Sequence, residues 1–273
     1  MTNITDHTVA IIPAAGRGTR LLPFTRYLPK EMMPLGDRPI IHHAMAEIQA
    51  AKIKTIVLVT AAGKESMVDY LLHHAPDLNQ QQLIVVEQQE QKGLGHAVWC
   101  SRNALPADTR HLAIIAPDDV LIKKTNGQDL AIGQLLQQAA TKPAAMWVAV
   151  EKIKPVDSNR YGVLTIGDQQ TTDGHVIYRA TNLVEKPAMA DAPSDVGIIA
   201  RYLLPHTILA QLDRTAPGAG GEIQLTDAMK GLLPHHAFYG LNTNLARLDT
   251  GTIDGLFAAN YFYRYGQFPP ATI

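Results

Sequence analysis

The sequence has one cysteine, Cys100, among its 273 residues. A lone cysteine cannot form a disulfide within the chain, which excludes a disulfide-stabilised fold and is compatible with a reducing compartment. The chain also lacks any apolar run approaching the roughly 18 residues that a membrane-spanning helix needs. Its N-terminal residues have neither the basic nor the apolar region of a secretory signal. We therefore expect a cytoplasmic protein with no membrane partner.

An excess of either charge is also absent. The sequence has 24 lysines and arginines against 25 aspartates and glutamates, which gives a net charge of −1. A nucleic-acid-binding surface requires a strong concentration of positive charge, so we expect no nucleic-acid partner. The cations are instead expected to gather in a local site for a small anionic substrate. With 46% hydrophobic residues, the chain can bury a sizeable core, and we expect residues 1–273 to form a single domain.

Short apolar segments rich in β-branched residues alternate with segments of helical periodicity in the first part of the chain. Strand patterns occur at 9–13, 55–60, 83–86, 111–116 and 146–150, and helical patterns at 40–51, 67–71, 97–104 and 130–140. This alternation predicts βαβ units and a mostly parallel central sheet flanked by helices.

The pattern changes after residue 150. Three strand-like segments, at 161–166, 176–180 and 182–185, follow one another with too few residues between them for helices. They predict antiparallel additions to the sheet. Further strands are expected at 198–204, 237–241 and 247–249, and further helices at 207–212, 224–233 and 254–263. The predicted fold class is α/β, with one half at about residues 1–150 and the other at about 151–273.

A glycine loop follows the first predicted strand. It contains Gly16, Gly18 and Arg20, and Lys30 follows it. Glycine allows backbone N–H groups to turn toward a phosphate, and arginine and lysine add full charges. A dinucleotide-binding fingerprint is excluded because Leu21 stands where its third glycine belongs, and no Gly-Lys-Ser/Thr completes a Walker A motif. The loop predicts a nucleoside triphosphate site, with a tight turn bearing exposed cations as the alternative.

A second glycine loop, at residues 93–97, also lies between a predicted strand and a predicted helix. Free N–H groups and the positive end of the helix favour an anion there. Gln88 precedes this loop and has both donor and acceptor atoms, so it is able to read a base edge. A solvated loop glutamine is the alternative interpretation of Gln88.

Acidic residues follow several of the predicted strands. Asp118 and Asp249 form a pair that suits Mg²⁺, which takes one or two carboxylates and completes its shell with phosphate oxygens and water. Either aspartate alone fits a turn or a helix cap equally well. Glu185 is followed directly by Lys186, which suits sugar hydroxyls beside a phosphate, or alternatively an ordinary strand exit.

Taken together, these motifs resemble those of the bacterial UTP–glucose-1-phosphate uridylyltransferases, within the wider sugar nucleotidyltransferase family. The resemblance covers essentially the whole chain and rests on residues 16–20, 29–34, 92–98, 161–163, 184–187 and 222–227. It implies a Rossmann-like nucleotidyltransferase fold that converts UTP and glucose 1-phosphate to UDP-glucose and pyrophosphate. The first half would bind the nucleotide and the second half the sugar phosphate. We also expect a homo-oligomer.

The resemblance implies roles for individual residues as well. Arg20 and Lys30 would contact the triphosphate as catalytic residues, and Asp118 and Asp249 would hold Mg²⁺. The nucleotide would be bound by Ala14, Ala15, Gly16, Gln88 and Gly93. The sugar phosphate would be bound by Gly162, Glu185 and Lys186.

The sequence departs from the family pattern at two places, one of which is the short segment between residues 70 and 83, where many relatives have a longer helical insertion. Ile253 stands where the uridylyltransferases usually have a lysine, and residues 249–252 resemble the thymidylyltransferase branch instead. Two alternatives to UTP chemistry therefore stay open at this point. One is a glucose-1-phosphate thymidylyltransferase that uses dTTP, and the other is a non-catalytic regulator that binds a nucleotide sugar.

Overall fold

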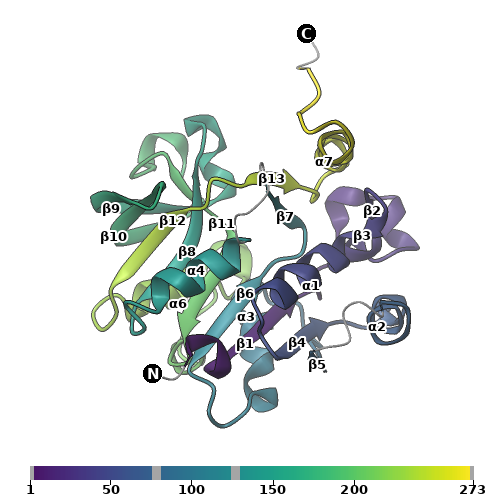
Figure 1. The fold of residues 1–273 in the computed structure, drawn as a ribbon, viewed down its shortest axis with the longest axis horizontal. Coiled ribbons are helices and arrows are strands. Elements are labelled where there is room, and N and C mark those ends of the chain that lie inside the picture. The colour runs from purple at the N-terminus through teal and green to yellow at the C-terminus, as the bar shows by residue number, and fades with distance from the viewer. Residues whose placement is uncertain (1–2, 76–80, 124–129, 271–273) are drawn as a thin grey trace.

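A computed structural model describes residues 3–75, 81–123 and 130–270 of the chain. Within these residues, nine strands form one sheet in the order β5-β4-β1-β6-β11-β8-β12-β10-β9 (Figure 1). In that order the strands span Gln82–Glu87, Thr55–Thr60, Thr8–Pro13, His111–Ile115, Val196–Pro205, Met146–Lys152, Phe238–Asn242, His175–Glu185 and Gly162–Thr172. Strands β10 and β11 run opposite to the rest. The predicted α/β class, with a mostly parallel sheet and antiparallel strands in the second half, is confirmed.

Helices cover both faces of this sheet because successive residues of β1 point to opposite sides. Val9 and Ile11 pack in a core with α3, α5 and α6, whereas Ala10 and Ile12 pack in a second core with α1, α2 and α4. In Figure 1, α1 and α4 lie in front of the sheet. The helices are α1 Ile40–Ala50, α2 Glu65–Asp69, α3 Leu94–Cys100, α4 Ala131–Ala139, α5 Ile208–Leu212, α6 Leu225–Leu232 and α7 Ile253–Tyr265. None of the helices among the described residues is long and apolar enough to cross a membrane.

The structure differs from the strand predictions at two places. The segments at 176–180 and 182–185 belong to one strand, β10, whose ladder with β9 shifts register between Ala180 and Asn182. After the turn at Pro117 and Asp118, the chain also forms a strand that was not predicted, β7, Asp119–Ile122, which pairs with β13, Ala246–Asp249, outside the main sheet. Pro117 ends β6, but the residues beyond it remain free to pair elsewhere.

The β7–β13 ladder matters for the site because it places Asp249 opposite Asp119. The backbone N–H and the hydroxyl of Thr250 both donate to the Asp118 carbonyl, at 2.9 and 2.8 Å. Strands β1 and β6 are parallel neighbours, so the glycine loop after β1 and Asp118 after β6 emerge at the same edge of the sheet.

A buried ion pair stabilises this edge of the sheet. Glu47 on α1 and Arg201 on β11 are 2% and 1% exposed, and the Glu47 carboxylate lies 2.9 Å from the nearest Arg201 guanidinium nitrogen. Glu47 also accepts from the Ile132 N–H at 3.0 Å, and Arg201 donates to the Ala116 carbonyl at 2.9 Å. Charges this deeply buried persist because each has a partner and further hydrogen bonds. The pair therefore links α1 and α4 to the segment that carries Asp118.

Candidate active site

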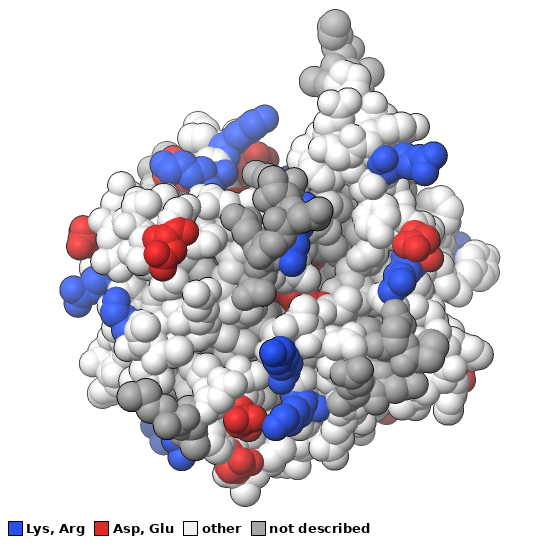
Figure 2. Space-filling view, viewed as in Figure 1, with Lys and Arg blue, Asp and Glu red and all other residues white. Residues whose placement is uncertain are grey.

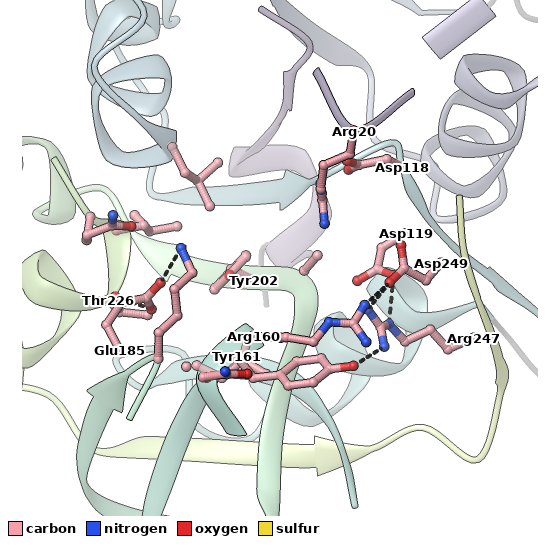
Figure 3. Close-up of a pocket in the computed structure, with 18 residues that line it drawn as sticks. Arg20, Asp118, Asp119, Arg160, Tyr161, Glu185, Tyr202, Thr226, Arg247 and Asp249 are labelled. Carbon is pink, nitrogen blue, oxygen red and sulfur yellow. Dashed lines mark hydrogen bonds and ion pairs between the residues drawn. The ribbon is translucent and has the colours of Figure 1, made fainter. Parts of the chain in front are cut away.

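A cavity of about 450 Å³ opens at this edge of the sheet (Figure 3). Six of the predicted site residues line it, namely Arg20, Asp118, Gly162, Glu185, Lys186 and Asp249. Figure 3 shows Arg20 pointing into the cavity beside Asp118, with Glu185 and Thr226 on one side and the side chains of Asp119, Arg160, Arg247 and Asp249 on the other. The structure thus brings residues from both halves of the chain around one space.

Lys30 and Asp118 form the ion pair that joins the glycine loop to the end of β6. The Lys30 Nζ donates to Asp118 Oδ2 at 2.6 Å. Burial alone would raise the pKa of Asp118, but the charge and hydrogen bond of Lys30 outweigh it and hold that pKa below its ordinary value. Burial alone would lower the pKa of Lys30, but Asp118 and Glu31 together raise it. Both groups are therefore charged near neutral pH.

Lys30 also lies against the first glycine of the loop. A Cβ added at Gly16 would be 3.8 Å from the Lys30 Nζ, an ordinary contact distance. Ala14 and Ala15 are buried, with 0% and 2% exposure, and they do not line the cavity. The predicted nucleotide-binding backbone therefore lies next to the cavity rather than on its wall.

A second ion pair beneath the loop was missed by the sequence reasoning. Lys64 precedes α2, and its Nζ donates to both carboxylate oxygens of Glu31, at 2.9 and 2.8 Å, and to the Ala14 carbonyl. Burial raises the pKa of Glu31 and lowers the pKa of Lys64, and the two charges oppose these shifts in each other. Glu31 lies within the motif at 29–34, but Lys64 has no sequence signal because a single lysine after a strand is usually solvated.

The second glycine loop serves a close approach between two backbone segments. The Gly95 N–H donates to the Ile223 carbonyl at 2.9 Å, and a Cβ at Gly95 would lie 2.6 Å from that oxygen. Gly93 has a φ of +94°, and a Cβ there would lie 2.7 Å from the Glu222 Cβ. The loop at 93–95 and the segment before α6 therefore pack without room for side chains.

Gln88 and Gly93 contact each other, although neither lines the cavity. The Gln88 Nε2 donates to the Gly93 carbonyl at 3.3 Å, and the next residue, Leu94, does line the cavity. The two glycine loops are also joined directly, because the Arg17 Nε donates to Gln91 Oε1 at 2.8 Å. The predicted base-contacting residues therefore lie together beside the glycine loop that follows β1.

The predicted sugar-phosphate residues form a compact group at the other end of the cavity. Gly162 and Glu185 are directly opposite each other in the β9–β10 ladder. The Thr226 hydroxyl donates to Glu185 Oε2 at 2.8 Å, and the Lys186 Nζ lies 3.2 Å from Glu185 Oε1. A Cβ at Gly162 would lie 3.0 Å from the Thr226 methyl carbon, so glycine keeps this corner open. Thr226 was not predicted as a site residue, although it lies in the segment 222–227 on which the family resemblance partly rests.

A cluster of arginines and carboxylates, which we name the arginine cluster, closes the cavity near Asp249. The Arg247 Nε donates to Asp119 Oδ1 at 2.7 Å, and its Nη1 donates to Glu151 at 2.9 Å and to the Tyr161 hydroxyl at 2.8 Å. Burial raises the pKa of Asp119 to about 6, against the opposing effect of Arg247. The arginine cluster comprises Asp119, Glu151, Arg160, Arg247 and Asp249. Only Asp249 of this cluster was predicted from the sequence, because the other members gain their roles from partners that lie far apart in the chain.

The arginine cluster also supplies a positive charge beside Asp249. This matters because Ile253, four residues later, stands where the family pattern has a lysine. Ile253 is the first residue of α7 and supplies no charge, and the Thr252 hydroxyl before it caps the helix by accepting from the Gly255 N–H at 3.1 Å. Arg160 instead places its Nη2 2.8 Å from Asp249 Oδ2. A cation therefore stands beside Asp249, contributed by the segment that precedes β9.

The donor set at Asp118 and Asp249 fits a hard divalent cation. Both carboxylates line the cavity, and a carboxylate binds a metal ion only through its oxygen atoms. Over the described ranges, no group of three or more His, Cys, Asp or Glu side chains is placed to hold a metal ion. Two carboxylates with phosphate oxygens and water are nevertheless a sufficient shell for Mg²⁺. The residues present therefore fit Mg²⁺ in the company of a phosphate ligand.

The fold and the site together define an α/β protein whose site lies at the C-terminal edge of a largely parallel sheet. A family model described as nucleotidyl transferase matches residues 9–266. The chain belongs to this family.

Individual relatives agree with the family assignment. The chain is 34% identical to a UTP–glucose-1-phosphate uridylyltransferase of Bacillus subtilis, with 89% of this chain and 86% of that protein covered. It is also 34% identical to the enzyme of the same name from Komagataeibacter xylinus, with 89% of each covered. A crystal structure of UDP-glucose pyrophosphorylase complexed with UDP-glucose matches with a TM-score of 0.86 and 29% identity, covering 96% of this chain and 100% of that one.

The close backbone approach at Gly93 can be tested with Gly63 as a matched control. Both glycines have positive φ, +94° and +84°, but a Cβ at Gly63 would meet nothing within 4 Å. Alanine should therefore strain the backbone at both positions and clash only at Gly93. We expect Gly93→Ala to lower the free energy of unfolding by about 1–3 kcal/mol more than Gly63→Ala, measured by urea denaturation. Equal losses in the two variants would contradict the packing described here.

Proposed function

We propose that this chain transfers a uridylyl group from UTP to glucose 1-phosphate, giving UDP-glucose and pyrophosphate. The observation that carries the proposal is the cavity itself. Arg20 and Asp118 line one end of it, Lys30 is paired with Asp118 beside that end, and Glu185 and Lys186 line the other end. The names of the similar proteins support the choice of UTP and glucose 1-phosphate.

The proposed reaction needs charge neutralisation and alignment rather than a general base. The phosphate oxygen of glucose 1-phosphate is already anionic, and it attacks the α-phosphorus of UTP. The bond from that phosphorus to the oxygen bridging to the β-phosphate breaks, and pyrophosphate leaves with the electron pair. Positioning and electrostatic stabilisation dominate the catalysis of such transfers.

The proposed roles follow from the charges around the cavity. Arg20 and Lys30 would contact the triphosphate and stabilise the departing pyrophosphate, because both are cations at the nucleotide end. Lys186 would hold the sugar phosphate. Glu185, fixed by the Thr226 hydroxyl, would accept hydrogen bonds from the glucose hydroxyls.

The remaining predicted contacts would come from small residues and an amide. The backbone at Ala14, Ala15 and Gly16 would hold the nucleotide, Gln88 and Gly93 would contact uracil, and Gly162 would leave space for the sugar.

Mg²⁺ is the proposed cofactor, and Asp118 and Asp249 would hold it. When bound, Mg²⁺ would neutralise charge on the phosphate oxygens. Lys30 and Arg160 already contact these two carboxylates, at 2.6 and 2.8 Å. Lys30 holds the pKa of Asp118 below its ordinary value despite burial, so this carboxylate is ionised and able to bind a cation.

Two alternatives are weaker than UTP chemistry. Thymine differs from uracil by one methyl group, and pocket shape discriminates such a difference by only about 1–3 kcal/mol, so dTTP is the second candidate nucleotide. A non-catalytic regulator would not need Arg20, Lys30, Asp118 and Asp249, all of which are retained at or beside the cavity.

We also propose that the enzyme acts in the cytoplasm as a homo-oligomer and binds no nucleic acid. Lysines, arginines, aspartates and glutamates are interspersed over the face shown in Figure 2, where the described residues form no continuous basic surface. The division into a nucleotide-binding half and a sugar-phosphate half of one domain stays a prediction.

The reaction is tested by incubating the protein with Mg²⁺, glucose 1-phosphate and one of UTP, dTTP, CTP, ATP or GTP. We expect the fastest pyrophosphate release with UTP. Release with dTTP alone would assign the chain to thymidylyl transfer, and no release with any nucleotide would favour the regulator.

The proposed roles of Lys30 and Asp118 are tested by substitution. We expect Lys30→Ala or Asp118→Ala to lower the turnover rate by roughly a hundredfold or more, the scale of losing one preorganised electrostatic contact. The exposed ion pair between Lys54 and Asp6, 2.9 Å apart, provides the control, since Lys54→Ala should leave turnover unchanged. Near wild-type turnover in Lys30→Ala or Asp118→Ala would contradict the assignment.

A further inference from the structure

Gln88 and His96 form a hydrogen-bonded pair beside the second glycine loop. Gln88 follows β5 and is 4% exposed, and its backbone N–H donates to the Thr60 carbonyl at 2.7 Å. Its side-chain Nε2 lies 2.9 Å from His96 Nδ1 and 3.3 Å from the Gly93 carbonyl oxygen. The amide nitrogen thus faces two neighbours at once, and both belong to the loop–helix segment that starts at Gly93.

These neighbours determine which way the amide points. A backbone carbonyl can only accept a hydrogen bond, so the Gln88 atom that faces Gly93 must be the NH₂ group. Its second hydrogen then points to His96 Nδ1, which must be the unprotonated nitrogen of the ring. The Gln88 Oε1 lies at the other end of the amide, and it accepts no hydrogen bond from the part of the chain that the structure describes. The Gln88 Oε1 is therefore available to accept a hydrogen bond from a ligand.

The His96 ring is held in place to act as that partner. It stacks on Trp99 with ring centroids 5.7 Å apart and an angle of 23° between the planes, and the Arg102 guanidinium lies 3.3 Å from the Trp99 ring centroid. Burial and the positive charge of Lys92 lower the pKa of His96, while Glu90 acts in the opposite direction. The lowered pKa favours the neutral ring, which leaves Nδ1 able to accept.

We propose that His96 is a positioning residue that acts together with the Gly93 carbonyl to hold the Gln88 amide with its oxygen free for the nucleobase, and that this hold increases the preference for uracil over cytosine. Uracil and thymine carry N3–H, a donor that matches Gln88 Oε1, whereas N3 of cytosine is itself an acceptor. If cytosine bound here, its N3 and the Gln88 Oε1 would be two acceptors facing each other in a buried position. This arrangement costs far more free energy than the loss of a methyl contact, such as the one that distinguishes thymine from uracil. The inference rests on the proposed function, in which Gln88 contacts the base.

Three substitutions at His96 separate this role from a packing role. His96→Phe keeps a ring to stack on Trp99 and removes the acceptor, and His96→Leu removes both. His96→Asn is the matched control because the asparagine Oδ1 can accept at about the position of Nδ1. The dissociation constants of UTP and CTP are measured by calorimetry with Mg²⁺ and without glucose 1-phosphate, so that no turnover is required.

We expect wild type and His96→Asn to prefer UTP. In His96→Phe and His96→Leu the preference for UTP over CTP should fall about tenfold or more, because only the longer hydrogen bond to the Gly93 carbonyl, at 3.3 Å, then opposes the turning of the Gln88 NH₂ group toward the base. An unchanged preference in either of these two variants, or equal affinity of the wild type for both nucleotides, would overturn the inference. Selective UTP binding without pyrophosphate release would instead refute the proposed reaction and leave this inference standing.

Discussion

The ion pair between Lys30 and Asp118 is the contact on which the rest of the site depends. It joins the loop after β1 to the end of β6, two segments that are close only because their strands are parallel neighbours. Each charge makes the ionised form of the other favourable despite burial. Gly16 packs against Lys30, and Glu31 beside it is held by Lys64, which also anchors the Ala14 carbonyl. The conformation of the glycine loop is therefore set largely by charge pairing.

The second half of the chain completes this arrangement through the β7–β13 ladder. That ladder lies outside the main sheet, yet it brings Asp249 and Arg247 to Asp118 and Asp119. The charges at this end of the cavity are balanced pair by pair, with Arg160 on Asp249 and Arg247 shared between Asp119 and Glu151. In the proposed reaction a polyanionic substrate would meet cations that are already fixed in position, which would lower the reorganisation that binding and reaction require.

Sequence patterns predicted the strands and helices of the main sheet well because each contains a run of regular periodicity. Residues 55–60, for example, are continuous and apolar, and they form β4 with the predicted bounds. The strand β7 was missed because Pro117 and two aspartates indicate the end of a strand, whereas pairing with the distant β13 forms a new strand directly after the turn at 117–118. Dependence on distant partners also limits what the sequence predicts about side chains. Lys64, Arg160 and Arg247 gain their roles from partners 33 to 128 positions away, which no local motif encodes.

The central claim is that one cavity holds the nucleotide end and the sugar-phosphate end of a single ligand. It is tested most directly by a crystal structure of the protein with UDP-glucose. We expect density for uracil at Gln88 and Gly93, for the diphosphate between Arg20 and Lys186, and for glucose against Gly162 and Glu185. Density for UDP-glucose elsewhere, or with the sugar turned away from Glu185, would contradict it.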